Sequence, residues 1–205
     1  MGGFPPHKDI FIRLTRGSQG VCTVIAEAVP ALHDAAMSTQ NLPKSDFGLR
    51  DGEVVVDLPA TPDAGVYFIG RIHTPWTERK SCPKNPAGSD AVCTVELDPR
   101  YVPGLKEVET CSHLILLYWM DRAPRNLVRQ VPGHYGVQRG TFALRSPARP
   151  NPIAMSVVRL LGIDGNKLSV VGLDCLDGTP LLDIKPYFAS IDSKPDAKVG
   201  WREQG

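Results

Sequence analysis

The feature that most restricts the fold of this chain is an Asp-Gly pair, Asp164-Gly165, between two runs rich in branched apolar residues. These flanking runs are Ile153–Ile163 and Lys167–Leu173. Both central positions of the commonest two-residue hairpin turn favour positive φ, which Asp-Gly accommodates, so the two runs are predicted to be antiparallel neighbours. A second such pair, Asp177-Gly178, is predicted to close this hairpin region.

Most of the chain after residue 65 has the pattern of short strands. The predicted strands are Val66–Ile72, Ala91–Leu97, His113–Met120, Thr141–Leu144, Ile153–Ile163, Lys167–Leu173 and Leu181–Ile184. Helical periodicity is limited to Asp121–Gln130, with one further turn expected at Val102–Val108. Many strands with tight turns and few helices favour a mainly β fold, a compact single-domain barrel or closed sheet, over an alternating βαβ fold.

Residues 1–63 differ from the rest because Gly, Pro, Ser and Asp interrupt them throughout. Only Val21–Ala36 has the pattern of a helix, and Val54–Leu58 that of a strand. We expect residues 1–63 to form a partly flexible N-terminal extension, which joins the core at Ala60–Gly65. The barrel domain is expected at residues 64–192, and a C-terminal tail at 193–205.

Several classes of protein are disfavoured by what the chain lacks. No apolar run approaches the roughly 18 residues of a membrane-spanning helix, and the N-terminal residues lack the regions of a signal peptide. The five cysteines are odd in number and form no C-x-x-C, which is typical of a reduced cytoplasm and does not indicate a metal site. Neither G-x-G-x-x-G, a P-loop nor G-x-S-x-G occurs, so Rossmann, P-loop and common serine hydrolase sites are not expected.

Positive charge is concentrated in one part of the chain. Residues 122–163 contain seven arginines and neither lysine nor acid, although the formal net charge of the whole chain is only +1. Within this segment, Arg145–Ile153 (R-S-P-A-R-P-N-P-I) is stiffened by three prolines. Guanidinium groups bind phosphate or carboxylate through two hydrogen bonds, so we predict an anion- or nucleotide-binding loop. The alternative is a surface loop whose arginines pair with acids.

Carboxylates cluster near the ends of two predicted strands. Asp174 and Asp183 lie among apolar residues and would need partners if buried, whereas Asp177 is also explained by turn chemistry. Asp121-Arg122 follows a buried strand, where site residues are common, although an N-cap role for Asp121 explains it equally well. The loop Pro75–Pro86 is interpreted either as a lid or as a solvated connection.

Histidine and cysteine give weaker indications of function. His73, His113 and His134 lack the spacing of metal ligands, so packing or hydrogen bonding is the favoured role. Cys175 lies in the carboxylate-rich stretch, but no histidine close to it in sequence marks it as a nucleophile.

Five motifs, in order, resemble those of the TsaA/TrmO family, also described as YaeB-like or VirR-like. They are Ile69–Trp76 (I-G-R-I-H-T-P-W), Cys111–Leu114 (C-S-H-L), Gly140–Ile153 (G-T-F-A-L-R-S-P-A-R-P-N-P-I), Asp177–Pro180 (D-G-T-P) and Asp183–Tyr187 (D-I-K-P-Y). The resemblance implies a non-Rossmann barrel that binds S-adenosylmethionine, forms a homodimer and acts on tRNA. The implied reaction is methylation of N6 of threonylcarbamoyladenosine at position 37.

The same resemblance implies a set of site residues. Cofactor contacts are expected from Asn85, Pro86, Asp121, Arg122, Arg145, Met155, Asp174, Cys175, Leu176 and Asp177. Asp121 is also the expected orienting group or proton acceptor for the reacting amine. Substrate contacts are expected from Arg149, Asn151, Lys185 and Tyr187: Arg149 would bind the threonyl carboxylate, Tyr187 the base, and Lys185 a phosphate.

Two departures from the family pattern leave questions open. Ala154 replaces the glycine that usually follows R-P-N-P-I, and the chain ends at Gly205 where longer bacterial relatives carry a further C-terminal domain. Residues 1–58 match nothing in the family. The alternatives to a methyltransferase are a non-catalytic RNA- or nucleotide-binding β-module that stacks bases on Trp76, Trp119 and Tyr187, a cofactor-sensing regulator, and a small-molecule hydrolase.

Overall fold

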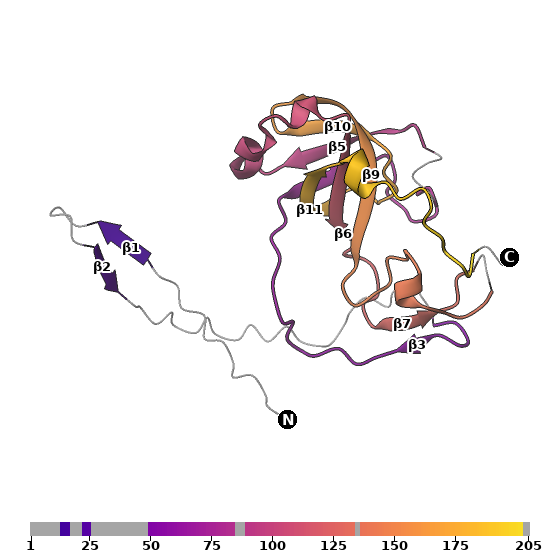
Figure 1. The fold of residues 1–205 in the computed structure, drawn as a ribbon. Helices are drawn as coiled ribbons and strands as arrows, with labels where there is room; N and C mark the ends of the chain where they lie inside the picture. The colour runs from indigo at the N-terminus through magenta and orange to yellow at the C-terminus, as the bar shows by residue number, and fades with distance from the viewer. Residues whose placement is uncertain (1–12, 17–21, 26–48, 85–88, 134–135, 203–205) are drawn as a thin grey trace. The chain divides into compact units, whose positions relative to one another are not determined.

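The computed structural model describes residues 13–16, 22–25, 49–84, 89–133 and 136–202 (Figure 1). The chain divides into two units, Met1–Leu42 and Pro43–Gly205. In the first unit, β1 (Arg13–Arg16) pairs with β2 (Cys22–Ile25) as an antiparallel hairpin. The helix predicted over Val21–Ala36 is therefore wrong at residues 22–25, where backbone pairing with β1 takes precedence over a weak helical pattern. The rest of that range lies outside the described residues.

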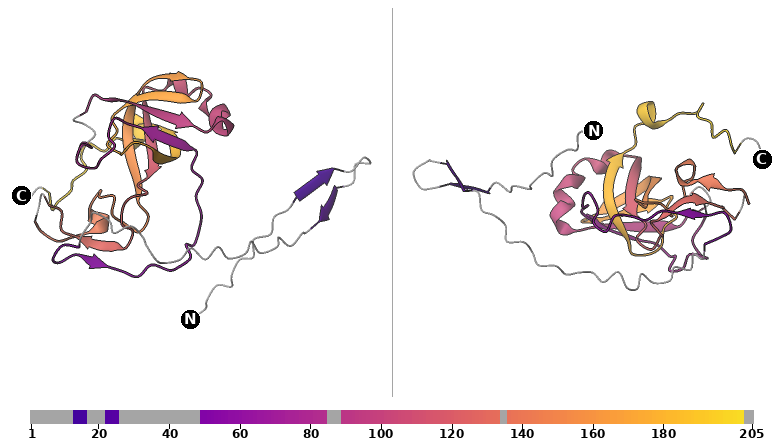
Figure 2. Two further views of the ribbon diagram at one scale, coloured as in Figure 1. Left: turned by 180° about the vertical axis from the view of Figure 1, so that it is seen from behind. Right: turned by 90° about the horizontal axis from the view of Figure 1, so that it is seen from below.

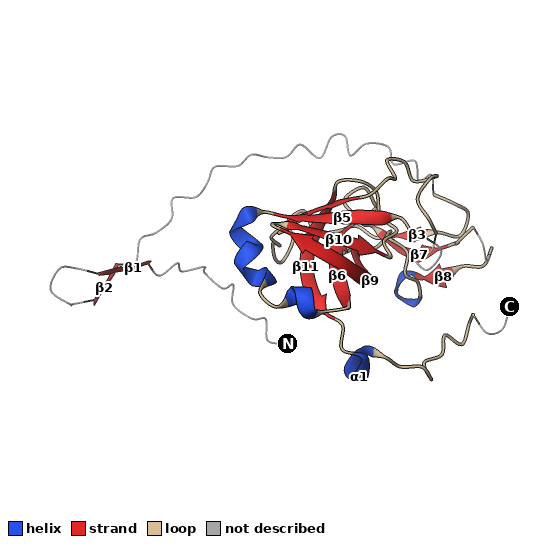
Figure 3. Cartoon of the chain, turned by 90° about the horizontal axis from the view of Figure 1, so that it is seen from above, coloured by secondary structure: helices blue, strands red, loops and turns tan. Residues whose placement is uncertain are grey.

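The second unit is built on a closed antiparallel barrel, which confirms the predicted fold class. Its strands follow the order β10-β5-β4-β11-β6-β9, and β9 pairs in turn with β10. Their bounds are β4 Gly70–His73, β5 Val92–Leu97, β6 His113–Trp119, β9 Ile153–Asp164, β10 Lys167–Val171 and β11 Thr179–Pro186. Figures 2 and 3 show that strands dominate the unit and that its helices are short.

The barrel interior is filled by the inward-facing residues of these strands. In β6 buried and half-buried residues alternate, as the period of two along a strand requires. The fully buried side chains of the interior include Ile72, Val95, Leu114, Leu116, Tyr118, Val158, Leu168 and Val170. Tyr118 is the largest of them, and its hydroxyl brings a polar group into this core.

The Asp164-Gly165 turn has the predicted form. Asp164 pairs with Lys167 across the β9–β10 hairpin, and Gly165 has φ +57°. A β-bulge at Ser169/Val170 then shifts the register of this pair. The hairpin therefore forms as turn chemistry predicts, and the bulge increases the local bend of the sheet, as barrel closure requires.

A second, three-stranded sheet joins the N-terminal segment to the arginine-rich region. It contains β3 (Val54–Val55), β7 (Leu127–Gln130) and β8 (Arg139–Gly140), in that order. Glu53 Oε1 accepts from Val131 N at 3.1 Å, and Val56 N donates to Asn126 O at 2.8 Å, so residues next to β3 also hold this sheet. The end of the extension at residues 50–56 is thus docked by its backbone.

Two predicted elements in this region are wrong. The helix predicted over Asp121–Gln130 is a turn followed by β7. Pro124 lacks an N–H and disfavours helical conformation in the residue before it, and the backbone of residues 126–129 pairs with β3 instead. The strand predicted at Thr141–Leu144 is a 3-10 helix, η4 (Thr141–Ala143). Its Thr141 side chain is buried and donates to Leu127 O at 3.0 Å, which holds the turn against β7.

The remaining helices are short. Two 3-10 helices, η2 (Pro99–Leu105) and η3 (Val108–Thr110), occupy the region where a turn was predicted, and α1 (Ala189–Asp192) follows β11. In the C-terminal tail the Trp201 ring lies 4.7 Å from the Arg139 guanidinium carbon, which links the tail to β8. Within the described part of the chain, no helix has the length and apolar character needed to cross a membrane.

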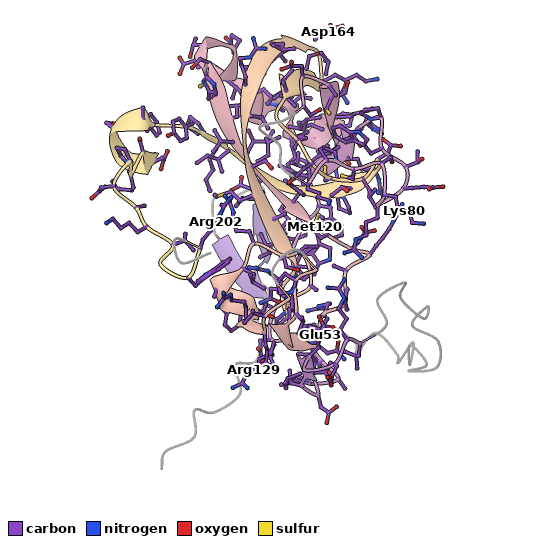
Figure 4. The ribbon with its side chains drawn as sticks, turned by 90° about the vertical axis from the view of Figure 1, so that its right-hand side faces the viewer. Glu53, Lys80, Met120, Arg129, Asp164 and Arg202 are labelled. Atoms are coloured by element: carbon purple, nitrogen blue, oxygen red, sulfur yellow. The ribbon has the colours of Figure 1, made fainter. Side chains whose placement is uncertain are left out.

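Strand direction assigns each loop to one of two barrel ends. The pairs Trp119↔Ile153 and Thr179↔Ile72 place the ends of β6 and β4 beside the starts of β9 and β11. The β9–β10 turn at Asp164 lies at the opposite end. Figure 4 shows this separation, with Asp164 at one end of the barrel and Met120 near the other, toward Arg129 and Glu53 of the small sheet.

Candidate functional site

Four segments that carry chemistry meet at the barrel end where β6 stops. They are the described parts of the loop after β4 (residues 74–84 and 89–91), the turn after β6 (120–126), the loop between β10 and β11 (172–178) and the segment that leads into β9 (141–152). They include the adjacent Asp121 and Arg122, and also Arg145 and Asp174, which are distant from this pair in the sequence. Barrel closure therefore brings together most of the residues that were predicted to bind a cofactor.

Asp174 is held by bonds on both its side chain and its backbone. Its Oδ1 accepts a hydrogen bond from the Tyr118 hydroxyl at 2.9 Å, and its carbonyl oxygen accepts from Cys82 Sγ at 2.8 Å. The Tyr118 oxygen lies 2.9 Å from Ser156 Oγ. A half-buried carboxylate, which sequence reasoning expected to need a partner, thus has one in the barrel core.

Asp177 is fixed from the end of β4. Its Oδ1 accepts from the backbone N–H of Thr74 at 3.1 Å and lies 3.4 Å from His73 Nδ1. The other ring nitrogen of His73 is 3.5 Å from Glu96 Oε2. His73 therefore lies between two carboxylates, those of Asp177 and Glu96, at ion-pair distances.

The other predicted residues of this loop contribute mainly backbone. The Cys175 side chain is fully buried, and its carbonyl accepts from Thr74 Oγ1 at 2.9 Å. Leu176 O accepts from the Thr179 hydroxyl at 2.7 Å. The conformation of residues 174–177 is thus set by Thr74, Thr179 and Cys82, and its outward-facing chemistry consists of the two carboxylates.

Arg145 lies against the first part of β9. Its Nη2 donates to the carbonyl of Met155 at 3.3 Å, and the rest of the guanidinium is exposed. Met155 is 47% exposed, whereas the next residue, Ser156, faces the core and contacts Tyr118. One short piece of β9 therefore connects the Arg145 guanidinium to the Asp174 carboxylate.

Arg149 braces its own loop. Its guanidinium donates to three backbone carbonyls, those of Ser146 (2.8 Å), Thr141 (3.4 Å) and Leu144. The buried Gln130 side chain adds a bond to Ala148 O at 2.6 Å. The proline-rich segment is thus held by side-chain bonds as well as by its fixed φ angles.

Among the described residues, the arginines of residues 122–163 do not pair with acids. None of the ion pairs among the described residues involves one of them. Arg125 instead lies over the Trp119 ring at 5.4 Å and donates to Pro150 O, and Arg122 is exposed. This arrangement disfavours the alternative of a surface loop neutralised by carboxylates, and it leaves donors available to an anion.

Other predicted site residues lie apart from this cluster. Lys185 and Tyr187 are at the opposite barrel end, since Lys185 pairs across from Ile115 and Tyr187 N donates to His113 O at 3.1 Å. Lys185 Nζ is 2.6 Å from Asp183 Oδ2. Asn151 is exposed at the start of β9. Asn85 and Pro86 lie outside the described residues, as does His134.

Asp121 is exposed and begins a turn. No helix follows it, so the N-cap explanation is wrong and its carboxylate is available at the strand end. In the part of the chain that is described, no group of histidine, cysteine and acidic side chains could hold a metal ion.

Two surface depressions on the barrel do not include this cluster. One of about 470 Å³ is lined by Phe68, Gly70, Arg71, His73, Glu96, Asp98 and Pro180. The other, of about 420 Å³, is mainly apolar and is lined by Val66, Tyr67, Ile69, Tyr101, Leu117, Ile153, Leu182 and Asp183. In the first, Arg71 already donates to Gly178 O and the acids pair with neighbouring cations. The cluster at the end of β6 remains the stronger candidate because its arginines lack acidic partners in the part of the chain that the structure describes.

The thiols of Cys82, Cys93 and Cys175 are expected to be poor nucleophiles, because their surroundings raise their pKa values. Burial, with a smaller contribution from Asp174, raises the pKa of Cys82 to about 11, and burial raises the pKa values of Cys93 and Cys175 as well. Only the thiolate is nucleophilic. Cys93 and Cys175 are therefore buried packing groups, and the half-buried Cys82 is a hydrogen-bond donor to Asp174 O.

Native Cys82 is expected to react with iodoacetamide at pH 8 on the order of 100-fold more slowly than it does in the urea-unfolded chain, because so little of it is thiolate. Peptide mass spectrometry of the alkylated chain measures this rate for each cysteine. Equal labelling of Cys82 in the native and unfolded chains would contradict the raised pKa of this half-buried thiol.

Sequence reasoning missed Tyr118, Ser156, Thr74 and Gln130. The bonds of Tyr118 reach residues 38 and 56 positions away, and those of Thr74 reach the loop more than 100 positions away. Thr74 stands within the first family-like motif, which offered some signal. For Tyr118 the only signal was a polar atom in the middle of an apolar strand.

These features define a small closed β-barrel with a mixed carboxylate and guanidinium site at one end. The chain belongs to the TrmO_N family, the tRNA-methyltransferase O N-terminal domain, whose model matches residues 71–193. A probable S-adenosyl-L-methionine-binding protein VirR from Rhizobium radiobacter is 46% identical over 151 residues, covering 74% of this chain and 85% of the relative. The tRNA (adenine(37)-N6)-methyltransferase of Escherichia coli is 35% identical over 146 residues, covering 66% and 62%.

Solved structures give the same family. TrmO from Pseudomonas aeruginosa superposes with a TM-score of 0.59 and 37% identity, covering 68% of this chain and 63% of that one. Some relatives are longer: a probable S-adenosyl-L-methionine-binding protein of Archaeoglobus fulgidus, 48% identical, is covered over only 37% of its length. The residues that the family model matches, 71–193, include nearly all of the barrel and its site loops.

Proposed function

We propose that this chain is an S-adenosylmethionine-dependent methyltransferase that acts on N6 of threonylcarbamoyladenosine at position 37 of tRNA. The observation that carries the proposal is the meeting of Asp121, Arg145 and Asp174 at one barrel end, in a chain of the TrmO_N family. The names of its relatives, an adenine-37 methyltransferase and several S-adenosylmethionine-binding proteins, support both the reaction and the cofactor.

The residues at this barrel end fit the chemistry of the cofactor. S-adenosylmethionine has a carboxylate, an ammonium group and ribose hydroxyls, which require a cationic donor and anionic acceptors. Arg145 offers exposed guanidinium donors, and Arg122 lies on the turn after β6. Asp174 and Asp177 each use Oδ1 in the described bonds, which leaves Oδ2 as an acceptor.

When bound, the cofactor supplies an electrophilic methyl group for in-line displacement, which requires no metal. The work of the chain is to hold the acceptor amine in line, which in favourable intramolecular models is worth ~7–11 kcal/mol. Asp121 is the proposed orienting group, because its exposed carboxylate lies on the turn that follows the strand carrying Tyr118. It can accept a hydrogen bond from the exocyclic amine and take its proton as the N–C bond forms.

Recognition of the modified base is assigned to the proline-rich segment. Threonylcarbamoyladenosine carries a carboxylate, and none of the described bonds of Arg149 uses Nη1, whose two N–H groups can bind that carboxylate. Asn151 is exposed on the same segment. Lys185 and Tyr187, at the far barrel end, would contact tRNA away from the reacting base.

An exposed apolar strip supports the further proposal of a homodimer. The side chains of Ile153, Met155 and Val157 on β9 are each more than 40% exposed, and Tyr67, which is 83% exposed, lines the apolar depression together with Ile153. A strip of this kind on a barrel is typical of an interface. Analytical ultracentrifugation of the purified chain distinguishes a dimer from a monomer.

Labelled methyl transfer tests the reaction and the substrate together. The expected result is incorporation into tRNA that carries threonylcarbamoyladenosine without the methyl group, and none into tRNA from cells that cannot make the threonylcarbamoyl group. Equal incorporation into both tRNAs would show that the carboxylate is not recognised. No incorporation into either would reject the proposed activity and favour a binding module.

A further inference from the structure

A chain of buried hydroxyl groups connects the barrel core to the candidate site. Tyr118, near the end of β6, is 1% exposed, and its hydroxyl lies 2.9 Å from both Ser156 Oγ and Asp174 Oδ1. A phenol has a single proton to donate. Since that proton goes to the carboxylate, Ser156 must be the donor in its bond with Tyr118. The chain therefore runs from Ser156 through Tyr118 to Asp174.

Burial keeps this phenol in its donor form. Desolvation, together with the neighbouring Asp174, raises the pKa of Tyr118 far above the usual value of a tyrosine. The hydroxyl is thus protonated throughout the physiological range. An unpaired hydroxyl at this depth would be costly, so Asp174 and Ser156 are its required partners.

These bonds fix the Asp174 carboxylate and leave one of its two oxygens without a described hydrogen bond. Tyr118 holds Oδ1, Cys82 holds the backbone carbonyl of the same residue, and no described bond uses Oδ2. Ser156 directly follows Met155, whose carbonyl accepts from Arg145. Tyr118 therefore ties the anionic side of the site to the strand that supports its cationic side.

We propose that Tyr118 is a positioning residue, whose buried hydroxyl orients the Asp174 carboxylate for a hydrogen bond to the cofactor. The inference rests on the proposed function, because it requires Asp174 to contact S-adenosylmethionine. Phenylalanine would fill the same volume of core, so packing alone does not require the hydroxyl. The hydroxyl is explained by what it does to Asp174.

The test is a double-mutant cycle on cofactor affinity. Tyr118→Phe is expected to weaken S-adenosylmethionine binding, measured by calorimetry, about tenfold, the usual effect of losing one hydrogen bond to a charged group. In an Asp174→Ala background the same substitution is expected to change the affinity less than twofold, because the group it orients is absent. Tyr101→Phe, on η2 at the far barrel end, is the matched control and is expected to have no effect.

The outcomes separate this inference from the function on which it rests. If the wild-type chain binds and Asp174→Ala weakens binding, but Tyr118→Phe binds like the wild type, the positioning role is wrong and the proposed function stands. A tenfold loss that persists in the Asp174→Ala background would also overturn it, since it would indicate a general structural effect. Failure of the wild-type chain to bind would reject both. Ser156→Ala, expected to cause a smaller loss of about threefold, supplies the same test if Tyr118→Phe does not fold.

Discussion

Replacing Gly70 by alanine is expected to destabilise the barrel by about 3 kcal/mol or more, at or beyond the upper end of the usual cost of overpacking. A Cβ at this position would lie 2.2 Å from Glu96 O and 2.9 Å from Leu97 Cα. Both atoms belong to the backbone of β5, so no side-chain rotation can relieve the clash. In thermal unfolding, followed by circular dichroism, the Tm should fall by roughly 6–12 °C.

Gly162→Ala is the matched control for this substitution. Gly162 is also in a barrel strand, β9, but a Cβ there would meet nothing within 4 Å. Its Tm is expected to remain near that of the wild-type chain. Equal stabilities of the Gly70 and Gly162 variants would contradict the close approach of β4 to β5 on which barrel closure depends.

Arg149→Ala is expected to reduce methyl transfer to tRNA by roughly 100-fold or more, the scale of loss caused by misplacing a catalytic group. The guanidinium supports three carbonyls of residues 141–146, and these lose their donor in the variant. Arg145 lies on the same segment, so cofactor affinity should fall several-fold as well. Labelled methyl transfer and calorimetry on the same preparation measure the two losses.

Two further variants identify the cause of this loss. Arg149→Lys should not restore activity. The planar guanidinium of arginine donates to three carbonyls at once, and the compact ammonium group of lysine cannot replace this set of hydrogen bonds. Arg159→Ala, which removes an exposed arginine from β9, should retain activity. An Arg149→Ala chain that transfers methyl groups at the wild-type rate would show that neither the brace nor the proposed clamp is needed.

The fold was predictable where local chemistry and pattern agreed. Asp164-Gly165 specifies its hairpin without distant information, and the alternation in β6 follows from one buried face. The prediction of a helix at Asp121–Gln130 was wrong. Pro124 disfavours helical conformation there, and the backbone of β7 pairs with β3 in spite of the helical periodicity of the sequence. That pairing joins residues more than 70 positions apart, and the sequence of residues 121–130 alone does not predict it.

For the candidate site, the sequence indicated which residues to consider but not the hydrogen bonds that connect them. Arg145 and Asp174 were identified from charge, from strand ends and from family motifs, and closure of the barrel brings them to one end. The support beneath them, from Tyr118 and Ser156, depends on which residues face inward at the same level of the barrel. For Arg149 the sequence predicted a ligand-binding role from its charge. The structure adds a second role, because its guanidinium donates to backbone carbonyls of its own loop.

The most direct test of this account measures S-adenosylmethionine affinity by calorimetry for two arginine or lysine variants at opposite barrel ends. Arg145→Ala, at the end where β6 stops, is expected to weaken binding at least tenfold through loss of a charge-assisted hydrogen bond. Lys185→Ala, at the other end, should bind within twofold of the wild-type chain. Wild-type affinity in the Arg145 variant, with weakened binding in the Lys185 variant, would place the site at the wrong end and contradict the account.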